Sequence, residues 1–551
     1  MGQIGLDGVK ARLGALFAPF ACDDGPGLVV GIARDEETIY RRGLGLASIE
    51  HGVINDPSVR MRIGSVSKHF ASLAALLLAE EGKLDIDAPA TDLLPELPPL
   101  RGVPTLRQFM NHTSGYRCST DLAFIGSGMN QRPKGSAFQT QIAQADVNFA
   151  PGDGQLYCNG GYHLLSLAIE RAAAVPFGRF LQQRIFAPLG MRDSEVASND
   201  MRIVARMATM HIPLPDGGWR RGLFPAEEIL GEGAIISTVD DMLIWLAHMR
   251  APKIVGDARI WGEMTAGTQV RDALWSPYGL GLSQLIYRGV EVIAHGGGVP
   301  GGSCAMLTVP EYSLDVVMMG NGGPANLADL QFRVIDAVLG DVLPPEKHTR
   351  PAATEFQALH GQRYHAESGV LFCFAAVGAE LGVSLFGSPP LTALHETGAT
   401  LQADFTSIYA GPFVWRRADL FADGADRPPD EIEMSECGRL SRFKRLPEVS
   451  PTVADSAPAL VGAYRCDDLG ADADIQLGED LALHIATPFG STTFRLEPLS
   501  DRVLLAKLVE VPGFTMALTR AVGGGGFHLT GARTRRLQFD SVDAPGHWTL
   551  P

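Results

Sequence analysis

The pattern of hydrophobic and polar positions differs between stretches of the chain. Apolar runs at residues 28–33 and 314–319 are typical of buried strands. Between them, apolar positions in residues 161–174 and 240–249 recur every three or four residues, which predicts helices. Strands around a helical middle predict an α/β layer whose first and last segments share one sheet. Further predicted elements are strands at 37–40, 43–48, 290–294 and 304–309 and a helix at 326–339.

The pattern of hydrophobic and polar positions changes after a linker marked by Pro344, Pro345 and Pro351. Short alternating runs broken by Gly, Pro and Asp follow, and they predict strands of antiparallel sheets. A second proline-bearing stretch, residues 447–458, divides this tail in two. The tail strands are predicted at 370–374, 380–386, 481–485 and 503–508.

Both halves of the tail begin alike, because Leu359-His-Gly-Gln-Arg-Tyr364 recurs as Leu460-Val-Gly-Ala-Tyr464. The repeat predicts two related all-β units, each a small antiparallel barrel. Chance similarity in so short a match is the open alternative. The predicted domains are therefore a catalytic domain at 1–345 and β-barrels at 346–450 and 451–551.

Composition indicates an ordinary folded protein with several domains. The chain has 551 residues, of which 46% are hydrophobic and 20% charged. A net charge of −16 argues against nucleic acid or an anionic membrane as partner. Lys10 and Arg12 interrupt the N-terminal segment, so no secretory signal is expected, and no apolar run is long enough to span a bilayer.

The cysteines favour a reducing compartment, so we expect a cytoplasmic protein. They number seven and are never spaced C-x-x-C, which argues against a disulfide framework or a zinc site. H-E-x-x-H is absent as well, and we expect neither a metal nor another cofactor.

Candidate chemistry begins at Ser65-Val-Ser-Lys68, just before a long apolar run at 70–78. In a helix, residues three apart are neighbours, so the Lys68 amine would lie beside the Ser65 hydroxyl. A partly desolvated lysine can accept the serine proton and create a nucleophile. Because Ser and Lys are common, the pattern alone is weak, and most such spacings belong to a solvated helix surface.

Further stretches follow in order. Tyr157-Cys-Asn159 comes after a Pro-Gly turn, and His295-Gly-Gly is placed at the end of an apolar strand. Gly296-x-Gly298-x-x-Gly301 matches a dinucleotide-binding pattern in spelling, but the strand predicted after it argues against that reading. The Gly-x-Ser-x-Gly nucleophile motif is absent.

The ordered set Ser-x-x-Lys, Tyr-x-Asn and His-x-Gly over residues 25–340 resembles the penicillin-recognising serine hydrolases. The resemblance is to the peptidase branch with class C β-lactamases, D-alanyl-D-alanine carboxypeptidases and esterases. Most members of that branch carry a Lys-Thr-Gly motif, and here His295 stands in place of its lysine. This histidine, together with two β-barrels after the catalytic domain, is similar to the aminopeptidases of the branch that act on D-residues. This resemblance implies a β-lactamase/transpeptidase-like α/β fold and a homodimer.

The resemblance also implies a role for each residue. Ser65 would form an acyl-enzyme, and Lys68 would keep the serine hydroxyl poised or accept its proton. Tyr157 would act as a second base with a pKa lowered by nearby cationic groups. Asn159 would hold a substrate carbonyl or the lysine. His295 would contact the substrate or tune Tyr157, with a plain turn residue before three glycines as the alternative.

The glycines after His295 and the last domain would complete the site. Gly297 and Gly298 leave room for substrate backbone, and the N–H groups of Ser65 and Gly298 would bind the oxyanion. Glu510, the one carboxylate between residues 505 and 518, would bind the substrate ammonium, with a plain solvated residue as the alternative.

We therefore expect a cytoplasmic serine hydrolase that releases a small N-terminal D-amino acid from a small peptide, amino-acid amide or ester. An esterase, a β-lactamase-like enzyme or a linear-peptide hydrolase on the same scaffold is the main alternative. A non-hydrolytic receptor for peptides or β-lactams is the alternative from another class.

Overall fold

The computed structural model describes residues 5–270, 275–322, 326–345, 350–388, 392–403, 413–420, 427–436 and 438–543. Residues 346–349 of the predicted linker lie outside these ranges. In the part of the chain that is described, no helix has the length and apolar character needed to cross a membrane.

The first domain is built on a six-stranded antiparallel sheet with the order β12-β13-β14-β15-β1-β2. The first and last strands of the domain lie side by side, with Leu28 opposite Gly320, as the sequence predicts. The strands are β1 (Leu28–Arg34), β2 (Glu37–Leu44), β12 (Ser283–Tyr287), β13 (Val290–Val299), β14 (Gly302–Val309) and β15 (Leu314–Gly320).

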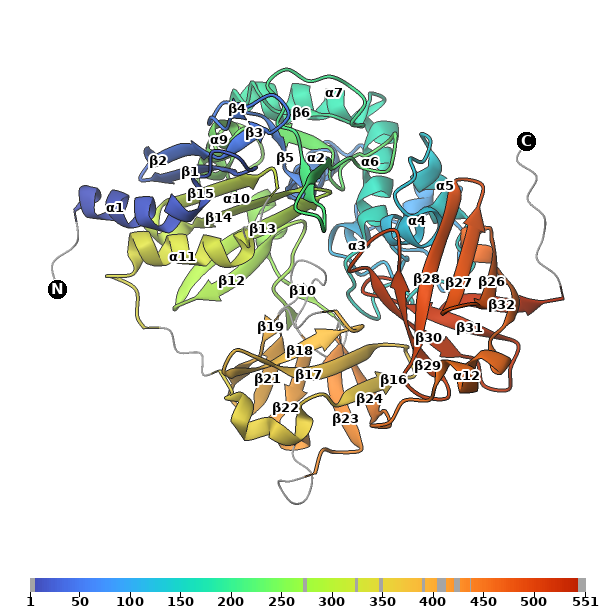
Figure 1. The fold of residues 1–551 in the computed structure, drawn as a ribbon. Helices are drawn as coiled ribbons and strands as arrows, with labels where there is room; N and C mark the ends of the chain where they lie inside the picture. Colours follow the sequence, from blue (N-terminus) through green and yellow to red (C-terminus); the bar gives the residue numbers. More distant parts are fainter. Residues whose placement is uncertain are drawn as a thin grey trace.

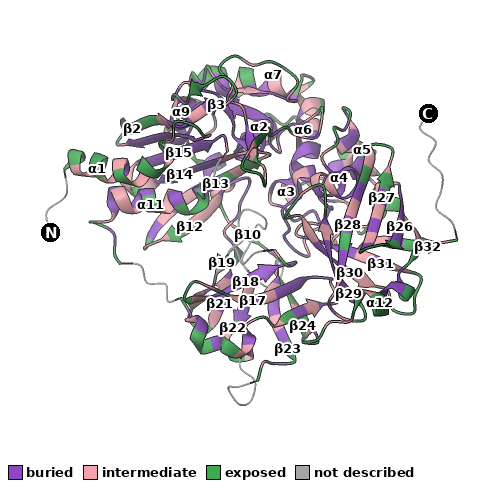
Figure 2. Cartoon of the chain, viewed as in Figure 1, coloured by how far each residue is buried: buried purple, intermediate pink, exposed green. Residues whose placement is uncertain are grey.

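Helices cover both faces of this sheet (Figure 1). On one face, α1 (Leu6–Phe17) and α11 (Leu327–Leu339) pack in a common core with the strands. On the other face lie α2 (Lys68–Glu80), α9 (Val239–Arg250) and α10 (Ala258–Thr265). Residues 68–78 of α2 are all buried, because this helix is apolar on every side and runs through the domain interior (Figure 2).

A second group of helices stands beside α2. It comprises α3 (Leu106–Met110), α4 (Ser119–Ser127), α5 (Ser136–Ile142), α6 (Asn159–Ala173), α7 (Phe177–Leu181) and α8 (Ala187–Leu189). Short strand pairs complete the domain: β3 (Leu46–Ser48) with β4 (Val53–Ile54), β5 (Met61–Arg62) and β6 (Glu195–Val196) with β9 (Ile235–Ser237), β7 (His211–Pro213) with β8 (Trp219–Arg221), and β10 (Thr268–Gln269) with β11 (Trp275–Ser276).

The middle unit is a nine-stranded antiparallel sheet that curls into a half-barrel, in the order β19-β18-β17-β16-β24-β23-β22-β21-β20. Its two end strands, β19 and β20, are separated in the chain by Leu394 alone. The strands are β16 (Arg363–Ala366), β17 (Leu371–Val377), β18 (Glu380–Leu385), β19 (Thr392–Ala393), β20 (His395–Thr397), β21 (Thr400–Ala403), β22 (Phe413–Arg416), β23 (Glu431–Glu436) and β24 (Arg439–Arg445).

The last unit is a closed antiparallel barrel of eight strands. Tyr464 is buried on its first strand, as Tyr364 is on the first strand of the half-barrel. A short helix, α12 (Val453–Ser456), precedes it. The strands are β25 (Gly462–Cys466), β26 (Ala471–Leu477), β27 (Leu481–Thr487), β28 (Gly490–Pro498), β29 (Val503–Leu508), β30 (Thr515–Arg520), β31 (Gly526–Thr530) and β32 (Leu537–Val542).

The closed barrel docks on the helices of the first domain. Leu122 and Ile125 of α4 belong to the core of the barrel, and Thr492 donates a hydrogen bond of 2.6 Å to the Ile125 carbonyl. The buried pair Arg117–Asp468, at 2.8 Å, joins the same two domains. This docking brings barrel loops to the face of the first domain that carries Ser65.

Candidate active site

Ser65 lies in a tight 3-10 turn, Gly64–Ser67, directly before α2. Gly64 has φ of +55°, a left-handed conformation that disfavours side chains. The turn lies against β13, because a Cβ at Gly297 would come within 2.0 Å of the Ile63 carbonyl oxygen. Glycines on both segments therefore let two backbones approach closely at Ser65.

The Lys68 amine lies beside the Ser65 hydroxyl, as the spacing predicts. Lys68 Nζ is 3.1 Å from Ser65 Oγ, and it donates to Asn159 Oδ1 at 2.8 Å and to the Glu232 carbonyl at 2.9 Å. The side chain is fully buried, and burial lowers the pKa of Lys68 to about 7 although the Glu232 carboxylate opposes the shift. A substantial share of Lys68 is thus neutral near pH 7.

Tyr157 is buried against the same lysine, with Lys68 Nζ 4.7 Å from the centre of its ring. We predicted a lowered pKa for this phenol, and that prediction was wrong. Burial raises the pKa of Tyr157 well above its ordinary value, and a hydrogen bond with Ser65 offsets only part of the rise. Tyr157 is therefore a protonated phenol in the resting site.

Asn159 is the first residue of α6 and lies beside Lys68. Its Oδ1 accepts from the ammonium, while its Nδ2 reaches Thr120 Oγ1 at 3.5 Å. The side chain thus holds the lysine, one of the two roles expected for it.

His295 does not end a strand, contrary to the sequence prediction. It lies in the middle of β13, which continues to Val299 because the following glycines stay paired with β14. The side chain is only 8% exposed, and burial lowers the pKa of His295 to about 3. The imidazole is accordingly neutral.

A chain of hydrogen bonds joins His295 to His112 through Tyr278. Tyr278 Oη is 3.2 Å from His295 Nε2 and 3.1 Å from His112 Nε2. The Cys158 N–H donates to His112 Nδ1, and His295 Nδ1 lies 2.6 Å from the Gly296 carbonyl. These contacts with the backbone assign the tautomers, because His112 Nδ1 is an acceptor and His295 Nδ1 carries a proton. His112 Nε2–H therefore donates to Tyr278, and the Tyr278 hydroxyl donates to His295 Nε2.

Both ring nitrogens of His295 are therefore committed within the protein. The residue is arranged to position its neighbours, and its ring lies 6.4 Å from that of Tyr157. The sequence prediction missed Tyr278 and His112 as parts of this chain. His112 belongs to Asn111-His-Thr-Ser-Gly115, which lies in the sequence between the Ser65 and Tyr157 motifs, whereas nothing near Tyr278 signals its role.

The site opens into a cavity of about 1040 Å³ at the junction of all three domains. Ser65, Tyr157, Asn159 and Gly298 line it from the first domain. The half-barrel contributes Phe386 and its neighbours, and the closed barrel contributes two loops, residues 509–515 and 532–533.

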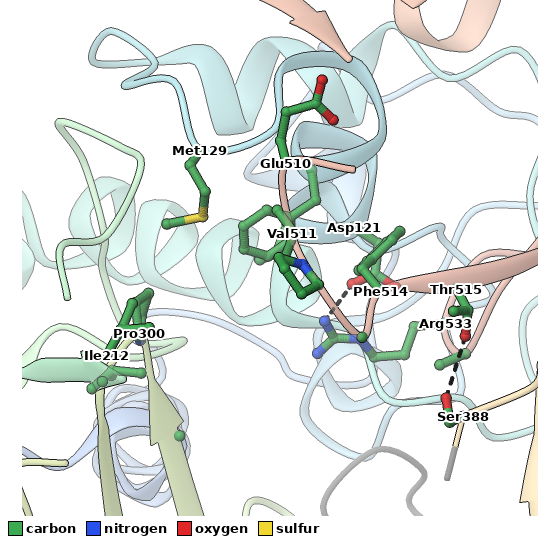
Figure 3. A pocket seen from close by; sticks show the side chains of 18 of the residues that line it. Asp121, Met129, Ile212, Pro300, Ser388, Glu510, Val511, Phe514, Thr515 and Arg533 are labelled. Atoms are coloured by element: carbon green, nitrogen blue, oxygen red, sulfur yellow. Dashed lines mark hydrogen bonds and ion pairs between the residues drawn. The ribbon is translucent and has the colours of Figure 1, made fainter. Parts of the chain in front are cut away.

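The closed barrel places two charged groups at the cavity. Glu510 is exposed, and its carboxylate accepts hydrogen bonds from the Thr493 N–H at 2.9 and 3.2 Å. Arg533 forms an ion pair with Asp121 of α4 (Figure 3). Figure 3 shows the Glu510 carboxylate turned away from this pair. Sequence reasoning missed Arg533 and Asp121, because neither belongs to a motif.

Comparison with known proteins assigns the fold to a family. A model of the beta-lactamase family matches residues 17–339, more than half of the chain. The chain belongs to the beta-lactamase family. Family membership and its relatives show that it is an enzyme, a hydrolase of this serine beta-lactamase fold.

Two curated relatives of this beta-lactamase family chain are D-aminopeptidases. The protein from Gluconobacter oxydans is 26% identical over 478 residues, which cover 85% of this chain and 84% of the relative. The protein from Brucella anthropi is 27% identical over 378 residues, covering 66% and 68%.

Solved structures share the fold. An octameric penicillin-binding protein homologue from Pyrococcus abyssi has a TM-score of 0.55 and 19% identity, covering 80% of this chain and 100% of its own. A D-amino acid amidase from Ochrobactrum anthropi has a TM-score of 0.51 and 23% identity, covering 61% and 98%. Within the described residues, no group of three or more His, Cys, Asp or Glu side chains is placed to hold a metal ion.

Proposed function

We propose that this enzyme releases an N-terminal D-amino acid from short peptides, amides or esters through an acyl-enzyme on Ser65. The observation that carries the proposal is the 3.1 Å contact between Ser65 Oγ and Lys68 Nζ in a buried setting. The D-aminopeptidases among the relatives support the substrate class.

In the proposed first step, neutral Lys68 takes the hydroxyl proton as Ser65 Oγ bonds to the substrate carbonyl carbon. The N–H groups of Ser65 and Gly298 stabilise the resulting oxyanion. The protonated phenol of Tyr157 donates to the leaving nitrogen as the C–N bond breaks, and Lys68 returns a proton to Tyr157. Water then attacks the ester, Lys68 takes a proton from it, and Ser65 regains its hydrogen.

Selection of a free amine is the second part of the proposal, with Glu510 as the carboxylate that binds the substrate ammonium. The carboxylate is exposed at the cavity and shares its charge with one backbone N–H, so it retains acceptor capacity. Glu510→Gln should raise KM for free-amine substrates more than for N-acetylated ones. Glu479→Gln, an exposed carboxylate of the same barrel, is the matched control.

The decisive experiment combines covalent labelling with a substrate screen. A fluorophosphonate probe should add its mass to the peptide containing Ser65, and Ser65→Ala should abolish it. Ser67→Ala should still be labelled, because the Ser67 hydroxyl accepts from the Ile235 N–H, away from the nucleophile. Persistent labelling of Ser65→Ala would refute the nucleophile.

The screen uses paired D- and L-aminoacyl p-nitroanilides with their N-acetylated forms. Turnover of D-substrates with free amines supports the aminopeptidase. Equal turnover of free and acetylated substrates would instead identify the esterase of the same family. The homodimer and the cytoplasmic location stay predictions, which light scattering and cell fractionation would test.

A further inference from the structure

Arg533 is the feature of the cavity that the proposed mechanism leaves unused. It lies on the loop between β31 and β32 of the closed barrel, and it lines the same cavity as Ser65 and Tyr157. Figure 3 shows its guanidinium reaching from the barrel loop to Asp121. A cation from the last domain thus lies in the cavity of the first.

The loop that carries Arg533 is held in place on both sides. The Asn148 side chain donates to the Arg533 carbonyl at 3.2 Å and accepts from the Arg535 N–H at 2.7 Å. The Arg535 guanidinium in turn pairs with buried Glu436 of the half-barrel, with Nε–Oε1 at 3.0 Å. Arg533 is therefore preorganised, which reduces the entropy lost when it binds a ligand.

Only part of the Arg533 guanidinium is engaged. Its Nη2 pairs with Asp121 Oδ1, and the side chains are 19% and 5% exposed. Among the described residues, Nε and Nη1 have no hydrogen-bond partner. A guanidinium presents five N–H donors in a planar fork that matches a carboxylate, so this one has capacity for a second.

The other charges around the cavity do not compete for that capacity. Asp121 is already paired with Arg533, and Glu510 is turned away and bonded to the Thr493 N–H. Arg220, the other cation of the lining, has no ion pair with the described residues. The charge available beside Arg533 is thus positive, whereas the remaining acceptor capacity of Glu510 faces away from it.

The remaining lining strengthens such a contact. Phe124, Phe514, Val511 and Ile212 form apolar walls around the charged groups. Charge-assisted hydrogen bonds are stronger where apolar surroundings displace water. The volume of about 1040 Å³ is ample for a short peptide.

We propose that Arg533 binds a carboxylate of the substrate, so that the enzyme prefers short peptides with a free C-terminal carboxylate over the matching amides. This inference rests on the proposed function, because it selects among the substrates of the same site. Through Arg533, the closed barrel would select substrates by their C-terminal end.

The test compares D-alanylglycine with D-alanylglycinamide, which differ only in the carboxylate. The wild-type enzyme should favour the free acid in kcat/KM by about 10- to 100-fold, the range for hydrogen bonds to charged groups. In Arg533→Gln that ratio should fall to about one, and in Arg533→Lys it should be intermediate because the fork is lost. Arg495→Gln, which alters a surface pair with Asp480 on the same barrel, should keep the wild-type ratio.

Stability of the variants needs a second design, because Arg533→Gln leaves Asp121 buried without its cation. The double variant Arg533→Gln with Asp121→Asn removes both charges and should also lose the preference. Thermal melting reports whether each variant is folded. A wild-type ratio near one, or a ratio that survives in folded Arg533→Gln, would overturn the assignment.

A binding measurement separates this inference from the proposed function. Calorimetry with N-acetyl-D-alanine and N-acetyl-D-alaninamide needs no turnover. Tighter binding of the acid than of the amide, with the difference lost in Arg533→Gln, supports the carboxylate site. If no D-substrate is hydrolysed at the same time, only the D-aminopeptidase activity is refuted. Equal binding of acid and amide by the wild type would overturn the carboxylate site.

Discussion

Ser65 and Arg533 lie on two walls of the same cavity. The two residues differ in the sequence separation from the side chain that each one contacts. Lys68 is three positions from Ser65, and one helical turn brings their functional atoms to 3.1 Å. Arg533 meets Asp121 across 412 positions, from a barrel docked on the first domain. The first wall follows from local helix geometry, and the second exists only when the domains are assembled.

This difference separates chemistry from selection. In the proposed function, the residues that break bonds come from the first domain, while the charges proposed to choose the substrate come from loops of the closed barrel. Such an arrangement allows the loops to change without disturbing Ser65. The predictions below alter one wall at a time.

The largest expected effect is on the wall of the first domain. Lys68→Ala removes the proposed acceptor of the Ser65 proton, and kcat should fall by about 1,000-fold or more. The measurement is turnover of the best D-substrate under saturating conditions. Lys83→Ala, a half-exposed lysine paired with Glu81, is the control and should retain activity. Activity within tenfold of wild type in Lys68→Ala would assign the base elsewhere.

The docking of the second wall should depend on Arg117. This fully buried side chain pairs with Asp468 of the barrel, so Arg117→Ala strands a buried carboxylate and should cost about 3–5 kcal/mol in the free energy of unfolding. Chemical denaturation measures the loss. Arg495→Ala breaks an exposed pair on the same barrel and should have little measurable effect. Equal losses in the two variants would contradict a docking role.

Tyr278→Phe tests the chain of hydrogen bonds behind the first wall. It leaves His112 Nε2–H and His295 Nε2 buried without partners, which should cost about 1–3 kcal/mol of stability. Misplacement of Tyr157 should lower kcat by about 10- to 100-fold. Tyr312→Phe, on a partly exposed phenol, serves as the control. Unchanged stability and kcat would show that the chain has no positioning role.

The smallest effect is a displaced pH profile. If neutral Lys68 is the base, kcat/KM rises as pH increases through about 7, the pKa of Lys68. The Glu232 carboxylate raises that pKa, so Glu232→Gln should lower it and move the rise to lower pH. Arg533 acts in the opposite direction, because its charge lowers the pKa of Lys68.

The control for this profile is Glu228→Gln, which alters the other carboxylate beside His163 and should leave the rise in place. The profile is measured over pH 5–9 with one free-amine substrate for every variant, so that titration of the substrate amine contributes equally to each profile. A fall in kcat/KM as pH increases through 7 would mean that protonated Lys68 is the active form. A shift of the rise to higher pH in Glu232→Gln would mean that Glu232 does not raise the pKa of Lys68.

The sequence predicted most of the fold that surrounds Ser65. The strands at the two ends of the first domain, helices α2, α6 and α9, and two all-β units in the tail follow from periodicity and turn residues. The main misjudged boundary was in β13, where glycines suggested an end. They are needed because the backbone of the Ser65 turn lies against them, a contact that no local pattern records.

The candidate site residues also divide into those that a local pattern indicates and those that only the folded chain brings together. Ser65, Lys68, Tyr157 and Asn159 could be proposed from the sequence, because the chemistry proposed for them depends on short spacings and ordered motifs. The direction of the Tyr157 pKa shift was not, since it depends on how completely other segments bury the phenol. The Arg533–Asp121 pair and the chain through Tyr278 were also hidden. They join residues that are distant in the chain, and only packing of whole domains brings such groups within hydrogen-bond distance.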